Sequence, residues 1–121
     1  MRVILVLILT FAQPVAASQP ISESLVQCAQ LFDLSNRQSG KAAMNEKGHT
    51  LKALAESYMQ AAETQAQTEG QGDPAAYVAA MAKRKAQLWD GKGRLYVFSE
   101  EFRDWARYCR KLGRHIGVNK P

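Results

Sequence analysis

The chain has 121 residues, a formal net charge of +5 and two cysteines. Its apolar content of 46% and charged content of 22% are ordinary for a globular protein, which excludes an intrinsically disordered chain. Residues 18–82 carry four Lys or Arg against seven Asp or Glu, whereas residues 83–121 carry eleven against four. The chain is therefore acidic first and basic last.

Residues 1–17, MRVILVLILTFAQPVAA, have the layout of a secretory signal peptide. Arg2 supplies a short positive start, an apolar run covers residues 3–12, and the segment ends on the small residue Ala17. This order predicts cleavage between Ala17 and Ser18. We therefore expect export, to the bacterial periplasm or to the extracellular medium.

Two other roles for this leader fit the sequence less well. A membrane anchor needs ~20 consecutive apolar residues, and the run here is much shorter. The letters LVQC at Leu25–Cys28 resemble a bacterial lipoprotein box, but Gln27 is bulky and polar where that motif needs a small residue. We expect the mature chain, residues 18–121, to be one domain with one core and no transmembrane segment.

Helical periodicity predicts two helices in the first half of the mature chain. The first begins at a cap on Ser22 and runs to about Asn36. Its apolar face comprises Leu25, Cys28, Ala29 and Phe32. The second covers residues 42–68, where Gly48 interrupts the apolar stripe; we expect one bent helix, with a broken start as the alternative. That stripe comprises Met44, Leu51, Leu54, Ala55, Tyr58 and Ala62.

The third helix has the clearest local signal in the chain. Asp73 can accept backbone N–H bonds as its cap, and Pro74 occupies the first helical position, where the missing donor costs nothing. Gly91 is placed to end the helix in the left-handed conformation. The buried face expected for this helix comprises Tyr77, Val78, Met81, Leu88 and Trp89.

Residues 91–98, GKGRLYVF, predict a compact, extended and non-helical segment with Leu95 and Val97 on one side. Ser99 then caps the last helix, whose first turn carries two glutamates that the helix dipole favours. The apolar face expected for this helix comprises Phe102, Trp105, Cys109, Leu112 and Ile116.

Four helices with almost no strand signal predict an all-α, small four-helix bundle-like domain. Cys28 and Cys109 each lie in the middle of an apolar stripe, so packing of the first helix against the last predicts a disulfide between them. An exported protein reaches the oxidising compartment that such a bond needs. In plan, a small exported helical domain with one long-range disulfide resembles periplasmic acid-stress chaperones and other envelope accessory proteins.

Little in the sequence points to catalysis or to a cofactor. It contains no glycine-rich phosphate loop, nucleophile elbow or His-Glu-x-x-His motif. Asp90, Glu101 and Asp104 are interpreted as surface or capping residues. The two histidines, His49 and His115, lack the further ligands that a metal site requires. We therefore expect no catalytic residues, no metal and no cofactor, although a site assembled from distant residues would escape this reasoning.

A basic stripe on the last helix is the best functional lead. Its cations recur at spacings of three, four and seven residues, which places them mainly on one exposed face. They are Arg103, Arg107, Arg110, Lys111 and Arg114. The alternative is a solvated face whose late cations complement the helix dipole. As a binding surface, it would attract an anionic envelope component or an acidic protein; nucleic acid is a poor match for an exported protein.

Lys85 is a second lead, because it falls among apolar residues of the third helix. Its ammonium either extends into water over a packed stem or lines a pocket between helices. The candidate pocket residues are Tyr77, Lys85, Trp89 and Trp105. The sequence thus favours a non-enzymatic exported binding or accessory protein, with a carrier of a small ligand and an enzyme as alternatives. It does not indicate an oligomeric state.

Overall fold

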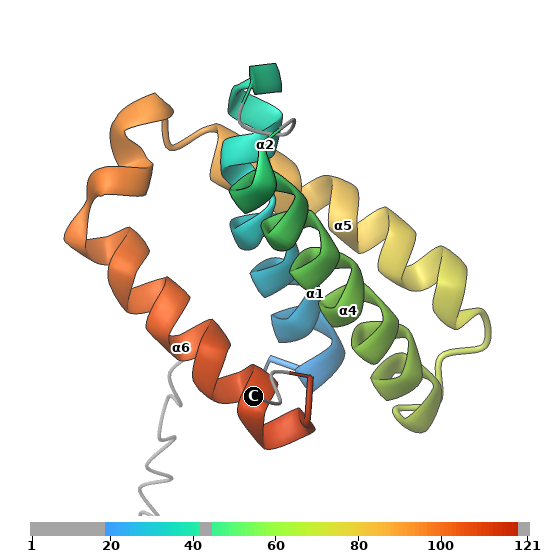
Figure 1. Ribbon diagram of the computed structural model, residues 1–121. Helices are drawn as coiled ribbons and strands as arrows, with labels where there is room; N and C mark the ends of the chain where they lie inside the picture. The colour runs from blue at the N-terminus through green and yellow to red at the C-terminus, as the bar shows by residue number, and fades with distance from the viewer. Residues whose placement is uncertain (1–18, 42–44, 119–121) are drawn as a thin grey trace, which may run out of the picture.

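The computed structural model describes residues 19–41 and 45–118, and within these ranges the chain is helical with no strand. The expected signal peptide and Met44 lie outside the described residues. In Figure 1 the last helix lies on the left, the other two long helices lie toward the right, and the first helix lies between them. The elements are α1 (Ile21–Phe32), α2 (Leu34–Gln38), α4 (Glu46–Thr68), α5 (Pro74–Asp90), η2 (Arg94–Phe98) and α6 (Glu100–Ile116). The all-α prediction is confirmed, with five α-helices in the described ranges where four were expected.

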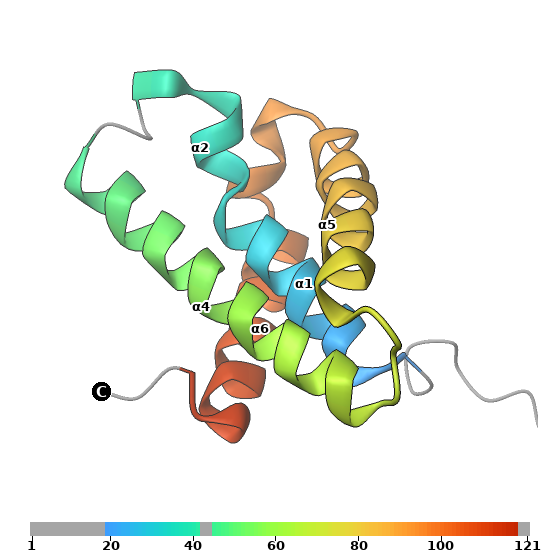
Figure 2. The ribbon, with the colours of Figure 1, turned by 90° about the vertical axis from the view of Figure 1, so that its right-hand side faces the viewer.

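Helix α1 is the central element, since α4, α5 and α6 all pack around it (Figure 2). Its residues are buried on every side, including the polar Ser22, Ser24 and Gln27. Apolar residues outside the predicted stripe, among them Val26 and Leu31, are buried as well. The apolar face predicted around Cys28 is only one of the buried faces of α1.

The start of α1 differs from the expectation. Ser22 is not the cap: Pro20 occupies that position and makes no side-chain cap bond. Instead, the Ser22 backbone N–H and hydroxyl donate to Glu69 Oε1 over 3.2 Å and 2.8 Å. A carboxylate from the C-terminal end of α4 thus satisfies donors at the positive end of the α1 dipole.

The first two predicted helices have different bounds in the structure. The first ends at Phe32, and the short α2 follows after Asp33, so the expected single helix to Asn36 is two elements. Helix α4 begins at Glu46, where the Asn45 side chain accepts from the Gly48 N–H at 2.7 Å. Gly48 therefore lies in the first turn of α4 and produces no mid-helix bend.

Helix α5 begins as predicted, with the Asp73 carboxylate accepting from the Ala76 N–H and Pro74 in the first turn. Two details were wrong. Gly91 has φ −67°, which is right-handed, and the glycine with a positive φ after α5 is Gly93, at 89°. Leu88 is 46% exposed, outside the buried face.

The segment expected to be extended is a 3-10 helix, η2. The positive φ of Gly93 turns the chain, and burial of Tyr96 then fixes η2 against α5 and α6, since its ring stacks on Trp89 and meets Phe102 edge-on. Ser99 caps α6 as predicted, accepting from the Phe102 N–H at 3.1 Å.

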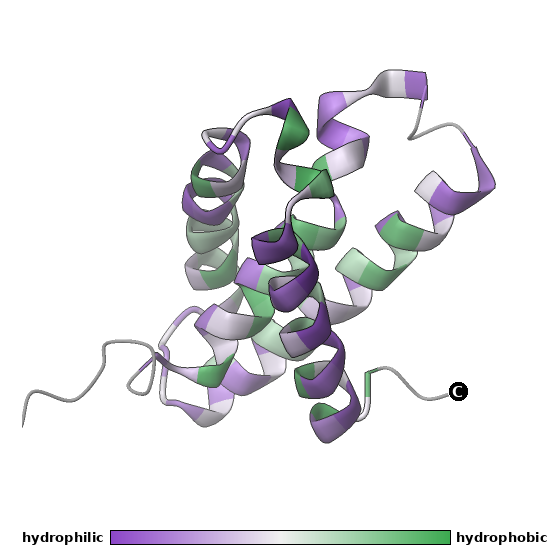
Figure 3. Ribbon diagram, turned by 90° about the vertical axis from the view of Figure 1, so that its left-hand side faces the viewer, coloured by the Kyte–Doolittle hydropathy of each residue, from purple (hydrophilic) through white to green (hydrophobic). Residues whose placement is uncertain are grey.

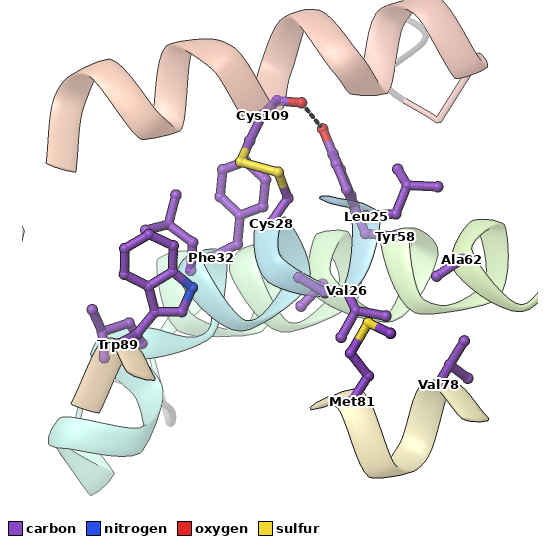
Figure 4. Close-up of a cluster of buried hydrophobic side chains, with 14 of the residues drawn as sticks. Leu25, Val26, Cys28, Phe32, Tyr58, Ala62, Val78, Met81, Trp89 and Cys109 are labelled. Atoms are coloured by element: carbon purple, nitrogen blue, oxygen red, sulfur yellow. Dashed lines mark hydrogen bonds between the residues drawn. A yellow bond between two sulfur atoms is a disulfide. The ribbon is translucent and has the colours of Figure 1, made fainter. Parts of the chain in front are cut away.

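A disulfide joins Cys28 of α1 to Cys109 of α6, as predicted (Figure 4). Their Cα atoms are 5.5 Å apart, although 81 residues separate them in sequence. Next to it, the buried Tyr58 hydroxyl of α4 donates to the Cys109 carbonyl oxygen at 2.6 Å. Three helices thus meet at one buried point in the core. Among the described residues, no helix combines the length and apolarity needed to cross a bilayer.

Candidate functional site

Four arginines of α6 line one open groove on the surface. Its volume is about 360 Å³, and Val97 of η2 with Phe102 and Ala106 of α6 supplies the apolar part of its wall. The arginines are Arg103, Arg107, Arg110 and Arg114. Their spacing of four, three and four residues keeps them on one face of an α-helix. We call this surface the arginine groove.

Helix α6 presents these arginines outward because its other face is committed to the core. Cys109 is fully buried in the disulfide, and Ala106 and Gly113 are buried one turn to either side. In Figure 3, which is coloured by hydropathy, the hydrophilic face of α6 is toward the viewer. The Cys28–Cys109 disulfide and the Tyr58 hydrogen bond thus hold α6 in the orientation that presents the groove.

One arginine of the groove has an acidic neighbour on the same helix. Arg107 lies 3.6 Å from Asp104, and both side chains are well exposed, at 70% and 63%. An exposed ion pair of this kind contributes little free energy, because water and salt screen the two charges. Lys111, the fifth predicted cation, is exposed but does not line the groove.

The helix dipole accounts for only part of this charge. Arg114 lies in the last turn of α6, near carbonyl groups that favour cations. Gly117, at φ 92°, and Val118 both donate their backbone N–H to the Gly113 carbonyl and close that end. Arg103 and Arg107 lie outside the last turn of α6, where the dipole gives cations no advantage. Their presence therefore needs another explanation than capping.

Of the four residues suggested as pocket lining, Trp105 lines a cleft described below, and none of the four lines the arginine groove. The Lys85 ammonium bonds Glu23 of α1 at 2.8 Å rather than extending into water, and its side chain is 15% exposed. Trp89 is buried and donates from Nε1 to the Gln27 carbonyl at 2.9 Å. Trp105 packs edge-on against Trp89 with centroids 5.4 Å apart, while Tyr77 is half-buried near the start of α5.

Trp105 does line a different cleft, of about 320 Å³. The other lining residues are Gln19, Ser24, Glu101, Asp104 and Tyr108. In the aromatic part of this wall, the Tyr108 ring meets the Trp105 ring edge-on. Gln19 is the first described residue, so the cleft lies where the described part of the chain begins.

Glu101 also affects the titration of Tyr96 in η2. Burial, followed by the negative charge of Glu101, raises the pKa of the Tyr96 hydroxyl to about 12 from an ordinary value of 10.0. Tyr96 is therefore neutral at physiological pH. It acts as a structural anchor there, not as an acid or base.

A metal-binding cluster is absent from the part of the chain that the structure describes. No three His, Cys, Asp or Glu side chains converge there in a way that could hold a metal ion. His49 and His115 are both exposed, and neither lines the arginine groove or the Trp105 cleft. The Cys28 sulfur is taken up by the disulfide, which removes it as an acylation site.

Comparison with known proteins adds no family: no protein-family model, curated protein or solved structure matches this chain.

The sequence did not predict that two apolar residues near the site are exposed together. Leu95 and Phe98 of η2 are 80% and 77% exposed. The extended conformation expected for this segment placed Leu95 with Val97 on one side, whereas the 3-10 turn places Leu95 with Phe98. The two glycines before this short apolar run, Gly91 and Gly93, were the available signal for a tight turn.

Proposed function

We propose that this protein is a non-enzymatic, exported binding or accessory protein that engages an anionic partner through the arginine groove of α6. One observation carries the proposal. Arg103, Arg107, Arg110 and Arg114 line a single groove that also contains apolar wall, on a helix fixed by a disulfide. A rigid concave surface of one charge sign concentrates field and attracts ligands of opposite charge.

Export is supported by the leader pattern and by the disulfide. A bond between cysteines 81 residues apart persists most readily outside the cytosol. The periplasm suits the style of the leader. The test is peptide mapping of native protein without reduction: an N-terminus at Ser18 and a peptide linking Cys28 to Cys109 are expected. Two free thiols or a retained leader would contradict this location.

The binding proposal is tested with three anionic probes: phosphatidylglycerol vesicles, dextran sulfate and polyglutamate. The wild-type, oxidised protein is compared with the triple variant Arg103→Glu/Arg107→Glu/Arg114→Glu. Arg110 stays in place because it also interacts elsewhere in the chain. The matched control is Lys52→Glu/Lys83→Glu/Arg84→Glu, which changes three exposed cations of α4 and α5 and gives the same net charge.

We expect at least one probe to bind the wild type and the control alike, and to lose at least about tenfold in affinity with the triple variant. Raising the salt concentration should weaken the same interaction, because exposed charges are screened beyond ~10 Å at 0.1 M. Equal binding by the two variants, or binding of no probe, would exclude the groove as the binding surface.

A second candidate function has one observation in its favour. The Trp105 cleft, with Tyr108 and two carboxylates in its wall, has the size of a small-molecule site and suits an amine with an apolar body. A carrier of such a ligand would show quenching of tryptophan fluorescence on titration with aromatic amines, and Asp104→Asn would weaken it. Unchanged fluorescence across such a series would remove this candidate.

A further inference from the structure

The 3-10 helix η2 carries two exposed apolar side chains and also borders the arginine groove. Leu95 and Phe98 are the two most exposed large apolar side chains among the described residues. They are three residues apart in a 3-10 helix, in which such positions lie on the same side. Val97 of the same helix lines the arginine groove. Figure 3 shows η2 directly above α6 on the face toward the viewer.

The apolar pair is held rigidly, which a loop tip ordinarily is not. Between its two members, Tyr96 points inward, 8% exposed, and its ring stacks on Trp89 at 5.9 Å. The Ser99 hydroxyl donates to the Tyr96 carbonyl at 2.6 Å and ties η2 to the start of α6. Anchoring of the middle residue thus forces its neighbours into solvent. Leu95 and Phe98 are displayed by the fold and are not the result of a loosely packed segment.

Two further cations precede this pair in the sequence. Lys92 and Arg94 precede it, both exposed, and the arginine groove follows it. The four groove arginines extend along roughly 16 Å of helix at 1.5 Å per residue. Carboxylates of Glu100, Glu101 and Asp104 also lie in the first half of α6, so the positive charge is strongest toward its C-terminal half.

We propose that η2 and α6 together form a docking surface for an anionic lipid bilayer, with Leu95 and Phe98 entering the interface and the arginines contacting phosphate head groups. This inference rests on the proposed function and specifies the partner of the same groove. A soluble anionic polymer would satisfy the arginines but would leave two large apolar side chains in water. An anionic bilayer satisfies both, since peripheral proteins combine apolar insertion with basic residues at the head-group level.

The arginines and the apolar pair each contribute modestly to membrane binding, and together they suffice for it. One basic residue near an anionic surface strengthens binding roughly fivefold, and a partly inserted Leu or Phe adds about tenfold. Stable membrane association generally requires two such signals together. The disulfide fixes the position of α6 against α1, and the buried Tyr96 fixes η2 against α6. The arginines and the apolar pair therefore keep one orientation relative to each other when they meet the bilayer.

The experiment measures binding of the oxidised protein to vesicles of phosphatidylglycerol and phosphatidylcholine, compared with vesicles of phosphatidylcholine alone. Wild type should bind only the anionic vesicles. Leu95→Ser/Phe98→Ser should lose at least about tenfold in affinity, by the apolar contribution above. The matched control, Ile21→Ser/Leu88→Ser, changes the two other exposed aliphatic residues, at 42% and 46% exposure, and should bind as wild type does.

Insertion itself is measured with Phe98→Trp and lipids brominated in the acyl chain. Quenching of the new tryptophan on anionic vesicles, beyond that of the wild-type tryptophans, is expected. Equal affinity of wild type and Leu95→Ser/Phe98→Ser, or no added quenching, overturns the inference. Binding to polyglutamate or dextran sulfate without binding to anionic vesicles also overturns it while leaving the proposed function intact; binding to none of the probes removes both.

Discussion

The Tyr58 hydroxyl donates a 2.6 Å hydrogen bond to the carbonyl oxygen of Cys109, 51 residues further along the chain. Tyr58 is fully buried, and the bond lies beside the disulfide from the same Cys109 to Cys28. Side chains of α4 and α1 therefore hold the same residue of α6. The orientation of the basic face follows from this arrangement.

Substitution of Tyr58 by Phe removes the hydroxyl and leaves the ring, which also packs edge-on against Phe32 at 5.2 Å. We expect Tyr58→Phe to lower the free energy of unfolding by about 1–2 kcal/mol, the usual cost of losing a buried hydrogen bond. Urea denaturation of the oxidised protein measures this. An unchanged unfolding midpoint would contradict a stabilising role for this bond.

Reduction of the disulfide should have a larger effect. Closing a loop of 81 residues restricts the unfolded chain and stabilises the fold by about 4–5 kcal/mol in the chain-entropy model. We expect the reduced protein to unfold at a much lower urea concentration than the oxidised one. Equal midpoints with and without reductant would show that packing alone holds α6 in place.

The ion pair between Lys85 and Glu23 is expected to stabilise the contact between α5 and α1. Their charged atoms are 2.8 Å apart, and the side chains are only 15% and 30% exposed. A double-mutant cycle with Lys85→Met and Glu23→Gln should give a coupling energy of about 1 kcal/mol, near the upper end for surface pairs. Strictly additive effects of the two substitutions would mean that the pair contributes nothing.

Tyr96 gives an expectation for alkaline pH. Its pKa in the folded protein is raised to about 12, above its ordinary value of 10.0. Between these two pH values the folded state retains the Tyr96 proton more often than the unfolded state does. The contribution of Tyr96 to stability is therefore complete below pH 10 and is lost as the pH rises toward 12. The free energy of unfolding should therefore fall less steeply over this window in Tyr96→Phe than in wild type. Parallel curves for the two proteins would contradict the raised pKa.

Features carried by short stretches of sequence were predictable. The caps at Asp73 and Ser99 bond to backbone within three residues, so their sequence signal is local. The disulfide followed from two apolar stripes and a secretory leader pattern, which together limit where two cysteines can lie.

Apart from the disulfide, features that depend on distant partners were not predictable. Ser22 reads locally as a helix cap, but Glu69, 47 residues away, supplies the acceptor. The glycines at 91 and 93 indicated a turn without fixing which of them has the positive φ. In η2, burial of Tyr96 between Trp89 and Phe102 selects a 3-10 turn over an extended strand. That choice also determines the exposure of Leu95 and Phe98, and so the apolar part of the candidate site.

The measurement that tests the central claim most directly is the ratio of dissociation constants of two variants of equal net charge. These are Arg103→Glu/Arg107→Glu/Arg114→Glu, in the groove, and Lys52→Glu/Lys83→Glu/Arg84→Glu, on α4 and α5. Helices α5 and α6 lie on opposite sides of α1 (Figure 1), so the pair separates the position of charge from its amount. We predict that the groove variant binds the anionic probe at least about tenfold more weakly than the other. A ratio near one, with both variants folded, would contradict the account.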